Sequence, residues 1–378
     1  MIVKGFGPRP AKVAVIGEYP GPEELAKGVP FSGTSGHLLK GMLREAGFNP
    51  DDIYFTNVLD DGPPPKRSAD KQPDFNAFFK GKDGVDQRLL AAKDRLRSEI
   101  KAVNPNLIIA CGGGALWATA GITGVMKWAG SQLRATADFG SAKLIPTYNP
   151  AFILRSYGEK FSMAKDLRRA RREADTFNYK LRGGIKYILE PTFEQVIEIL
   201  HTWHILFDEW STDIETARVQ IECIGIAVTD ELAMCIPFMD PRKPDWCYWT
   251  FEQEMYIRGL LKFYLTHPRR QIIGQNFDYD MQYFIARYGF WPKVKWDTMI
   301  MSHILYCELP KSLDYLARLW AKEYVYWKDD GKIVDFKTPP RQRWEYNCRD
   351  CCYTLEIAHV LKEQLRQQNM LHVYEHRV

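Results

Sequence analysis

The stretch HILFDEWSTDIETARVQIECIGIAVTDELAMCIPF, residues 204–238, sets the fold of the second half of this chain. It holds runs of β-branched and aromatic residues with polar residues between them, a pattern that predicts a β-hairpin. Asp213 and Glu215 lie two positions apart on the first predicted strand, so both side chains project from the same face. The two carboxylates can therefore reach one metal site.

A second acidic cluster lies in NFDYDMQYFIARYGF, residues 276–290. This segment predicts a helix that the chain enters from a strand, RQIIGQ, residues 270–275. On such a helix Asn276 and Asp280 would lie four residues apart and share a face. The segment therefore adds a third candidate carboxylate.

A third cluster lies in RWEYNCRDCCYTLEIAHVLKEQLRQQ, residues 343–368. Its apolar residues recur at helical spacing and predict one long helix. Tyr346 and Asp350 are four residues apart, so a phenol and a carboxylate should emerge side by side. In such a site the phenol would orient an attacking water.

Three ordered acidic clusters suit the hydrolysis of a phosphodiester. That reaction develops charge on the attacking and the leaving oxygen, and two divalent ions about 3.5–4 Å apart stabilise both. Mg²⁺ takes oxygen ligands and keeps several waters, so a few carboxylates can hold the pair. The clusters therefore indicate a nuclease.

Residues from about 185 to the end resemble the proofreading 3′→5′ exonuclease domain of family A DNA polymerases, the DNA polymerase I type. That family carries Asp-x-Glu on its first strand, then an Asn-x-x-x-Asp helix and a Tyr-x-x-x-Asp helix. The matching stretches here are DIET at 213–216, NFDYD at 276–280 and YNCRD at 346–350. The resemblance implies an RNase H-like mixed sheet, two Mg²⁺ or Mn²⁺ ions and a single-stranded 3′ end as substrate.

The same resemblance implies a role for each of five residues. Asp213, Glu215, Asp280 and Asp350 would be metal ligands, and Tyr346 would position the attacking water.

Two neighbouring acids compete for a place in this set. Asp278 is the alternative to Asp280, and the spacing from Asn276 favours Asp280. Asp297 precedes TMIMSHIL, residues 298–305, and is predicted to be a helix N-cap rather than a ligand.

The first half of the chain has a different pattern, in which short apolar strands alternate with helices. This order predicts a three-layer α/β/α domain with a parallel sheet, whose sites lie at the carboxyl ends of the strands. Glu18, Phe31, Asn57 and Asn149 all fall just after strands or in the adjoining loops. The predicted strands are in AKVAVIG (11–17), DIYFTNVL (52–59), NLIIACGG (106–113) and AKLIPTYNP (142–150).

Residues from about 10 to 175 resemble the uracil-DNA glycosylase superfamily, family 4 above all. The motifs are GEYPG (17–21), GVPFSGTSG (28–36), FTNV (55–58) and TYNPAFILR (147–155). Enzymes of this kind extrude a base from the duplex before they cut it.

By position, Glu18 would activate or orient the water that attacks the sugar. Phe31 would stack on the flipped base and Asn57 would read its pairing edge. Tyr19 belongs to the same predicted site, and Arg155 lies in the loop that would approach the opened DNA.

Two departures from family 4 leave alternatives open. Asn149 stands where that family has His, although other branches of the superfamily use Asn-Pro here. Family 4 also binds an iron–sulfur cluster through four Cys, and Cys111 is the only Cys before residue 200, so no iron–sulfur cluster is expected. The first half is therefore either an active glycosylase or an inactive module that binds DNA or a polymerase.

These patterns predict two domains, 1–178 and 179–378. The formal net charge is only +4, so this chain is not basic over its whole surface. No stretch reaches the roughly 20 apolar residues of a membrane helix, and MIVKGFGPRP at the N-terminus lacks the apolar core of a signal peptide. A cytoplasmic location without membrane contact, in a bacterial host or a phage-infected cell, is expected.

The order of the two domains resembles some phage-type replication polymerases. The last residues, NMLHVYEHRV (369–378), resemble the start of the helix that leads from exonuclease to palm in family A. The expected partners are primer-template DNA and a DNA polymerase, as a further domain of a longer chain or as a separate subunit.

Overall fold

The computed structural model describes residues 2–64, 75–78, 84–176, 185–330 and 339–377. Its contacts divide the chain into two units. Unit 1 is Met1–Leu181 with Glu323–Tyr326, and unit 2 is Arg182–Lys322 with Trp327–Val378. The predicted boundary between residues 178 and 179 lies outside the described residues.

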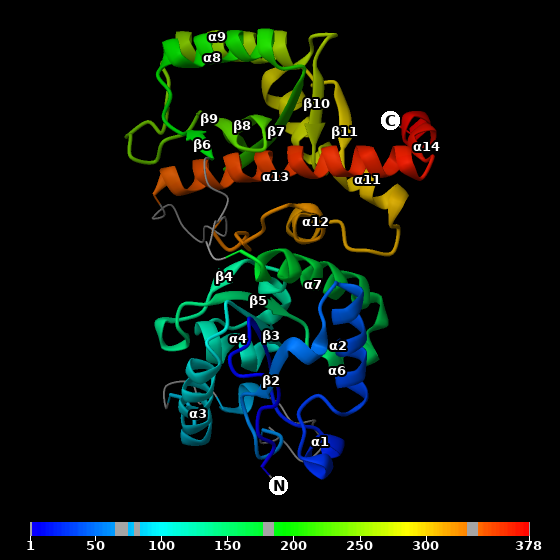
Figure 1. Ribbon diagram of the computed structural model, residues 1–378. Helices are drawn as coiled ribbons and strands as arrows, with labels where there is room; N and C mark the ends of the chain where they lie inside the picture. The colour runs from blue at the N-terminus through cyan, green and yellow to red at the C-terminus, as the bar shows by residue number, and fades with distance from the viewer. Residues whose placement is uncertain (1, 65–74, 79–83, 177–184, 331–338, 378) are drawn as a thin grey trace. The chain divides into compact units, whose positions relative to one another are not determined.

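Unit 1 is built on a five-stranded sheet of order β2-β1-β3-β5-β4 (Figure 1). The strands are β1 (Val13–Gly17), β2 (Ile53–Asn57), β3 (Leu107–Cys111), β4 (Leu133–Arg134) and β5 (Lys143–Thr147). All neighbours pair in parallel except the short edge strand β4, which is antiparallel to β5. The carboxyl ends of β1, β2, β3 and β5 therefore share one edge of the sheet.

Helices cover both faces of this sheet, because successive strand residues point to opposite sides. Val13, Val15 and their neighbours pack against helices α2 (Thr34–Glu45) and α7 (Lys160–Ala174). The alternating set, which includes Ile16, packs against helices α3 (Gln87–Val103) and α4 (Gly113–Ala120). The predicted three-layer α/β/α arrangement is confirmed. The other helices of unit 1 are α1 (Pro22–Lys27), η1 (Pro50–Asp52), η2 (Phe75–Phe78), α5 (Val125–Trp128), η4 (Ala137–Phe139), α6 (Pro150–Arg155) and η5 (Tyr157–Glu159).

Unit 2 is built on a mixed six-stranded sheet of order β11-β10-β7-β8-β9-β6. β7, β8 and β9 form an antiparallel meander, and β10, β11 and β6 add in parallel at its two sides. The predicted hairpin is confirmed as β7–β8, with Arg218 and Val219 at its turn in the left-handed region, at φ 50° and 58°. The strands are β6 (Lys186–Ile188), β7 (Glu209–Ala217), β8 (Gln220–Thr229), β9 (Leu232–Pro237), β10 (Gln271–Gly274) and β11 (Val294–Asp297).

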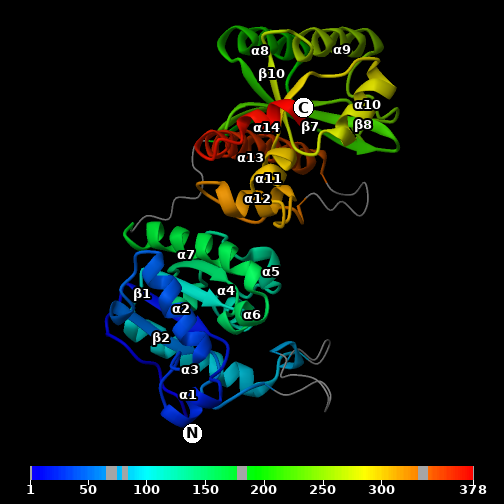
Figure 2. The same ribbon diagram turned by 90° about the vertical axis from the view of Figure 1, so that its right-hand side faces the viewer.

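One long helix and a pair of shorter ones cover the two faces of this sheet. Figure 2 shows α8 (Phe193–Leu206) and α9 (Phe251–Leu265) together on one side and α13 (Pro340–Gln367) on the other. The predicted long helix around residues 343–368 is thus confirmed. The remaining helices of unit 2 are α10 (Asp278–Tyr283), the π-helical turn η6 (Phe284–Tyr288), α11 (Thr298–Leu305), α12 (Leu313–Trp320) and α14 (Leu371–Arg377). No helix among the described residues is long and apolar enough to cross a membrane.

Buried thiols fill the contact between α13 and the sheet of unit 2. Cys223 and Cys235 come from β8 and β9, and Cys348, Cys351 and Cys352 come from α13. All five are fully buried in one apolar cluster with Trp344. Burial raises the pKa of the Cys235 and Cys348 thiols well above its usual value. These thiols therefore stay neutral and pack as small apolar side chains.

One prediction about the second acidic cluster is wrong. Helix α10 begins at Asp278, and Asn276 lies before it with φ 53°, so Asn276 and Asp280 do not share a helical face. The carboxylate of Asp297 accepts hydrogen bonds from the backbone N–H groups of Asn276 and Phe277, and this holds the chain in a turn. Asp297 also accepts from Met299 N and Ile300 N as the N-cap of α11, so its predicted capping role is confirmed.

Candidate functional site

Three carboxylates from β7 and α13 meet in unit 2. Asp213 and Glu215 share a face of β7, and α13 crosses that strand and brings Asp350 to them. One oxygen from each of the three lies within 4.8 Å of the others. Among the described residues, this is the group of acidic, His or Cys side chains that could hold a metal ion.

Asp280 lies beside this group, at the start of α10. Its Oδ1 accepts a hydrogen bond of 2.9 Å from the backbone N–H of Ile214, the residue between Asp213 and Glu215. Asp280 is buried and Asp278 is exposed. The geometry therefore brings Asp280 toward the cluster, although its oxygens are outside the group of three.

Burial and mutual repulsion hold these acids far from their ordinary titration. Burial, followed by the charges of Asp280, Glu215 and Asp350, raises the pKa of Asp213 well above its usual value. Burial and then Asp350 raise the pKa of Glu215 to about 8, and burial raises the pKa of Asp280 to about 7. Asp350 is buried and Asp213 and Glu215 are half-buried, and carboxylates gathered in this way need a compensating cation. The donor set, all oxygen and negatively charged, fits hard divalent ions such as Mg²⁺ or Mn²⁺.

Two further side chains, of Lys328 and Trp327, contact the phenol of Tyr346 and the carboxylate of Asp350 on α13. Lys328 Nζ donates to Asp350 Oδ2 at 2.5 Å and to Tyr346 Oη at 2.8 Å. Trp327 Nε1 donates to Asp350 Oδ1 at 2.5 Å. Sequence reasoning missed Lys328 and Trp327, because they follow α12 in a segment without periodicity or a motif.

Asn347 is a third residue that sequence reasoning missed. Its Nδ2 donates to Asp213 Oδ2 at 2.8 Å, and the side chain is fully buried. The amide fits only because residue 225 is Gly: a Cβ there would lie 2.4 Å from Asn347 Oδ1. A polar residue next to Tyr346, on the face of α13 that packs on the sheet, was the available signal.

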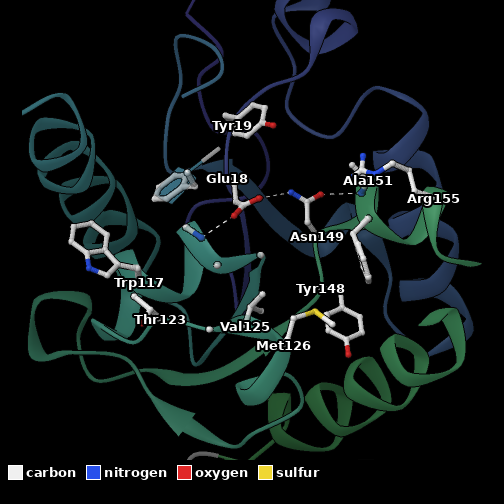
Figure 3. A pocket seen from close by; sticks show the side chains of 16 residues that line it. Glu18, Tyr19, Trp117, Thr123, Val125, Met126, Tyr148, Asn149, Ala151 and Arg155 are labelled. Carbon is white, nitrogen blue, oxygen red and sulfur yellow. Dashed lines mark hydrogen bonds between the residues drawn. The ribbon is translucent and has the colours of Figure 1, made fainter. Parts of the chain in front are cut away.

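In unit 1 the predicted residues gather at the carboxyl edge of the sheet. Glu18 follows β1, and its Oε1 accepts from the backbone N–H of Gly114 in the first turn of α4 at 2.9 Å. Its Oε2 accepts from Asn149 Nδ2 at 2.6 Å (Figure 3). Asn149 Oδ1 in turn accepts from Ala151 N and caps α6. Both oxygens of Glu18 are therefore held by neutral donors.

Two cavities, of about 430 and 390 Å³, meet at Glu18 and Asn149. Phe31 and Asn57 line the smaller one, and both pack close over Gly17, where a Cβ would lie 2.3 Å from Asn57 Oδ1 and 2.8 Å from Phe31 Cζ. Asn57 is 3% exposed, and its Nδ2 has no hydrogen-bond partner among the described residues. A buried donor without an acceptor is costly and suits a ligand carbonyl.

Tyr19 and Arg155 line both cavities, and Trp117 and Met126 line the larger one (Figure 3). Burial and the charge of Glu18 raise the pKa of Tyr19, whereas the charge of Arg155 lowers it. Arg155 ends α6 and is exposed. The structure thus brings Glu18, Tyr19, Asn149 and Arg155 together in the lining that the two cavities share.

Two family models match the two halves of the chain. The model described as "Uracil DNA glycosylase superfamily" matches residues 4–172. The model described as "3'-5' exonuclease" matches residues 192–366.

Known proteins resemble one half or both. The type-4 uracil-DNA glycosylase of Thermotoga maritima is 32% identical over 158 residues, 41% of this chain and 72% of that protein. The DNA polymerase of Bacillus phage SP01 is 22% identical over 341 residues, 80% of this chain and 34% of that protein. The solved catalytic core of RRP6 from Trypanosoma brucei aligns with a TM-score of 0.42 and 15% identity, over 52% of each chain. The chain therefore spans about a third of the phage polymerase that it matches.

Proposed function

We propose that this chain, which belongs to the uracil-DNA glycosylase superfamily through residues 4–172, is a DNA-processing enzyme. Because it also carries a 3′–5′ exonuclease domain at residues 192–366, we propose that its main activity is proofreading. Its exonuclease domain hydrolyses the 3′-terminal phosphodiester of single-stranded DNA with the help of two divalent ions. The observation that carries this proposal is the convergence of Asp213, Glu215 and Asp350 within 4.8 Å, with Asp280 beside them.

Each side chain has a role in this proposal. Asp213, Glu215, Asp280 and Asp350 hold Mg²⁺ or Mn²⁺, and the bound ions supply charge stabilisation at the attacking and the leaving oxygen. Burial and the charge of Asp350 raise the pKa of Tyr346, so its phenol stays protonated and can donate a hydrogen bond that orients the attacking water.

The partners follow from this chemistry. We propose that the substrate is the single-stranded 3′ end of a primer-template, and that a DNA polymerase, as a further domain or as a separate subunit, delivers it. The 22% identity with the phage polymerase supports this partner. We also propose that the protein acts in the cytoplasm of a bacterial host or a phage-infected cell and binds no iron–sulfur cluster, since Cys111 is the only Cys before residue 200.

The test is digestion of a 3′-labelled single strand in the presence of Mg²⁺. Asp213→Ala combined with Glu215→Ala should lower the rate by more than about a thousandfold. Asp278→Ala is the matched control, because Asp278 is exposed two residues from the buried Asp280. An unchanged rate in the double variant contradicts the proposal, and a larger loss in Asp278→Ala than in Asp280→Ala overturns the choice of Asp280.

The second candidate function is uracil release by unit 1. It rests on the buried Asn57, whose Nδ2 has no hydrogen-bond partner in the described part of the chain. Asn57 lies in a cavity that Phe31 and the Glu18–Asn149 pair also line. We propose that Phe31 stacks on an extruded base, Asn57 donates to its pairing edge, and Glu18 orients the attacking water. Arg155 would contact the opened DNA.

Glycosidic cleavage of this kind uses no metal ion, so release of uracil in EDTA separates the two activities. With enzyme in excess over substrate, a uracil-containing duplex should lose its base, and Glu18→Gln should slow this release strongly. If the wild-type protein releases no uracil while Glu18→Ala still binds DNA, unit 1 is an inactive module that binds DNA or a polymerase.

A further inference from the structure

A lysine ammonium lies inside the carboxylate cluster of unit 2. Lys328 Nζ is 2.5 Å from Asp350 Oδ2 and 2.8 Å from Tyr346 Oη. It also lies 4.9 Å from the centre of the Tyr346 ring. The Lys328 side chain is only 23% exposed and that of Asp350 only 5%. The ammonium is therefore a largely buried positive charge at the place where a divalent ion would bind Asp350.

The residue before Lys328 fixes this arrangement. Trp327 Nε1 donates to the other oxygen of Asp350, and the indole stacks on Tyr353 with ring centres 4.3 Å apart. Trp327 is 1% exposed, so the backbone beside Lys328 is anchored while the lysine side chain keeps its flexible stem. The Lys328 Nζ can thus move away from Asp350 by rotation of its own side chain, while the Lys328 backbone and α13 stay in place.

Electrostatics decide whether Lys328 and a divalent ion can share Asp350. An indole N–H can stay on a carboxylate that also binds a metal, because an ionised carboxylate accepts at about four positions. A full positive charge within a few ångströms of Mg²⁺ in a buried site is strongly repelled. Binding of the ion and the contact between Lys328 and Asp350 therefore exclude each other.

We propose that Lys328 is an exchangeable internal cation of the exonuclease site. It neutralises part of the charge of Asp213, Glu215 and Asp350 before metal binds, and it leaves Asp350 when metal arrives. Lys328 is thus a positioning residue, which holds Tyr346 and Asp350 in place while the site is empty of ions. This inference rests on the proposed metal site.

Another buried lysine of the same unit serves as a matched control. Lys362 on α13 has a side chain that is 6% exposed and pairs with Glu209, which also binds His359. Neither Lys362 nor Glu209 belongs to the group of three carboxylates. Its removal should destabilise the protein whether or not metal is present.

The experiment measures binding of Mg²⁺ alone, without DNA, by titration calorimetry, and thermal unfolding in EDTA and in Mg²⁺. Lys328→Met should bind Mg²⁺ about tenfold more tightly than the wild type, because one opposing charge is gone. Its unfolding temperature should rise more on Mg²⁺ addition than that of the wild type. Lys328→Arg keeps the charge and should bind Mg²⁺ as the wild type does. Lys362→Met should show the same rise as the wild type, from a lower starting temperature.

The outcomes separate this inference from the proposed function. If the wild type binds no Mg²⁺, or if Asp213→Ala with Glu215→Ala binds it equally well, the metal site itself is wrong. If the wild type binds Mg²⁺ and Lys328→Met binds it no more tightly, Lys328 is only a structural partner of Asp350 and the inference is wrong. Should Lys328→Met fail to fold in EDTA, Lys328→Gln takes its place with the same expectation, and equal affinity in that variant overturns the inference.

Discussion

The two candidate sites of this chain treat their acidic residues in opposite ways. In unit 2, Asp213, Glu215 and Asp350 repel one another in a partly buried cluster, and the pKa of Glu215 rises to about 8. In unit 1, neutral donors from Gly114 and Asn149 bind the two oxygens of Glu18. The first arrangement needs cations from solution to become active. The second holds its carboxylate with neutral donors, and this difference in local charge balance is the reason to test the metal dependence of each half of the chain separately.

Removal of metal should break the comparison most sharply. With excess EDTA, digestion of a labelled single strand should fall by more than about ten-thousandfold, because the carboxylate cluster has no chemistry without its ions. Release of uracil from a duplex should be unchanged in the same tube. Loss of both activities would mean that unit 1 also needs a metal ion.

Glu18→Gln tests the other half. Gln keeps the shape and one acceptor oxygen, but it cannot carry the negative charge that draws a proton from water. Uracil release should therefore fall by roughly a hundredfold or more. Exonuclease activity should stay at the wild-type level, and a parallel fall in both would indicate misfolding rather than chemistry.

Asn347→Ala should have a smaller effect, confined to unit 2. The variant removes the hydrogen bond that orients Asp213 Oδ2, and loss of such a partner of a metal ligand lowers affinity or activity by about 10- to 100-fold. Half-saturation with Mn²⁺ should shift to a higher concentration, as titration calorimetry can show. An unchanged Mn²⁺ affinity with a lower unfolding temperature would reduce Asn347 to a packing role.

The smallest effect is a dependence of stability on pH. A raised pKa in the folded protein means that the native state keeps a proton that the unfolded chain releases. Stability without metal is therefore lost as pH rises from the ordinary value of Glu215, 4.5, to about 8. In EDTA, the thermal transition that responds to Mg²⁺ should move several degrees lower between pH 5.5 and 8. With Mg²⁺ bound, this dependence should flatten.

Local patterns predicted much of the fold and part of the candidate site. Alternation along β7 and helical periodicity along α13 depend on near neighbours in sequence, so the hairpin and the long helix could be predicted. The prediction that Asn276 lies within a helix is wrong, because the side chain of Asp297, 21 residues farther on, accepts a hydrogen bond from the backbone N–H of Asn276. No local pattern signals such a contact.

Lys328 and Asn347 illustrate the same limit within the site. Lys328 reaches Asp350 from a segment without regular structure, and Asn347 depends on the missing side chain of Gly225 on a strand far away in the sequence. The motifs identify groups that act by their own chemistry. Groups that act by orienting or neutralising others become visible only when the chain is folded.

The five thiols buried between α13 and the sheet of unit 2 allow local opening of this contact to be measured directly. Cys247 and Cys307 are exposed and should react with an alkylating reagent in the native state, whereas Cys223, Cys235, Cys348, Cys351 and Cys352 are shielded. Cys111, buried in unit 1, can add one further adduct, so a mass increase beyond three adducts would record separation of α13 from the sheet. The rate of that alkylation, followed with and without Mg²⁺ by intact-mass spectrometry, measures how firmly ions clamp the two elements together, without any engineered probe.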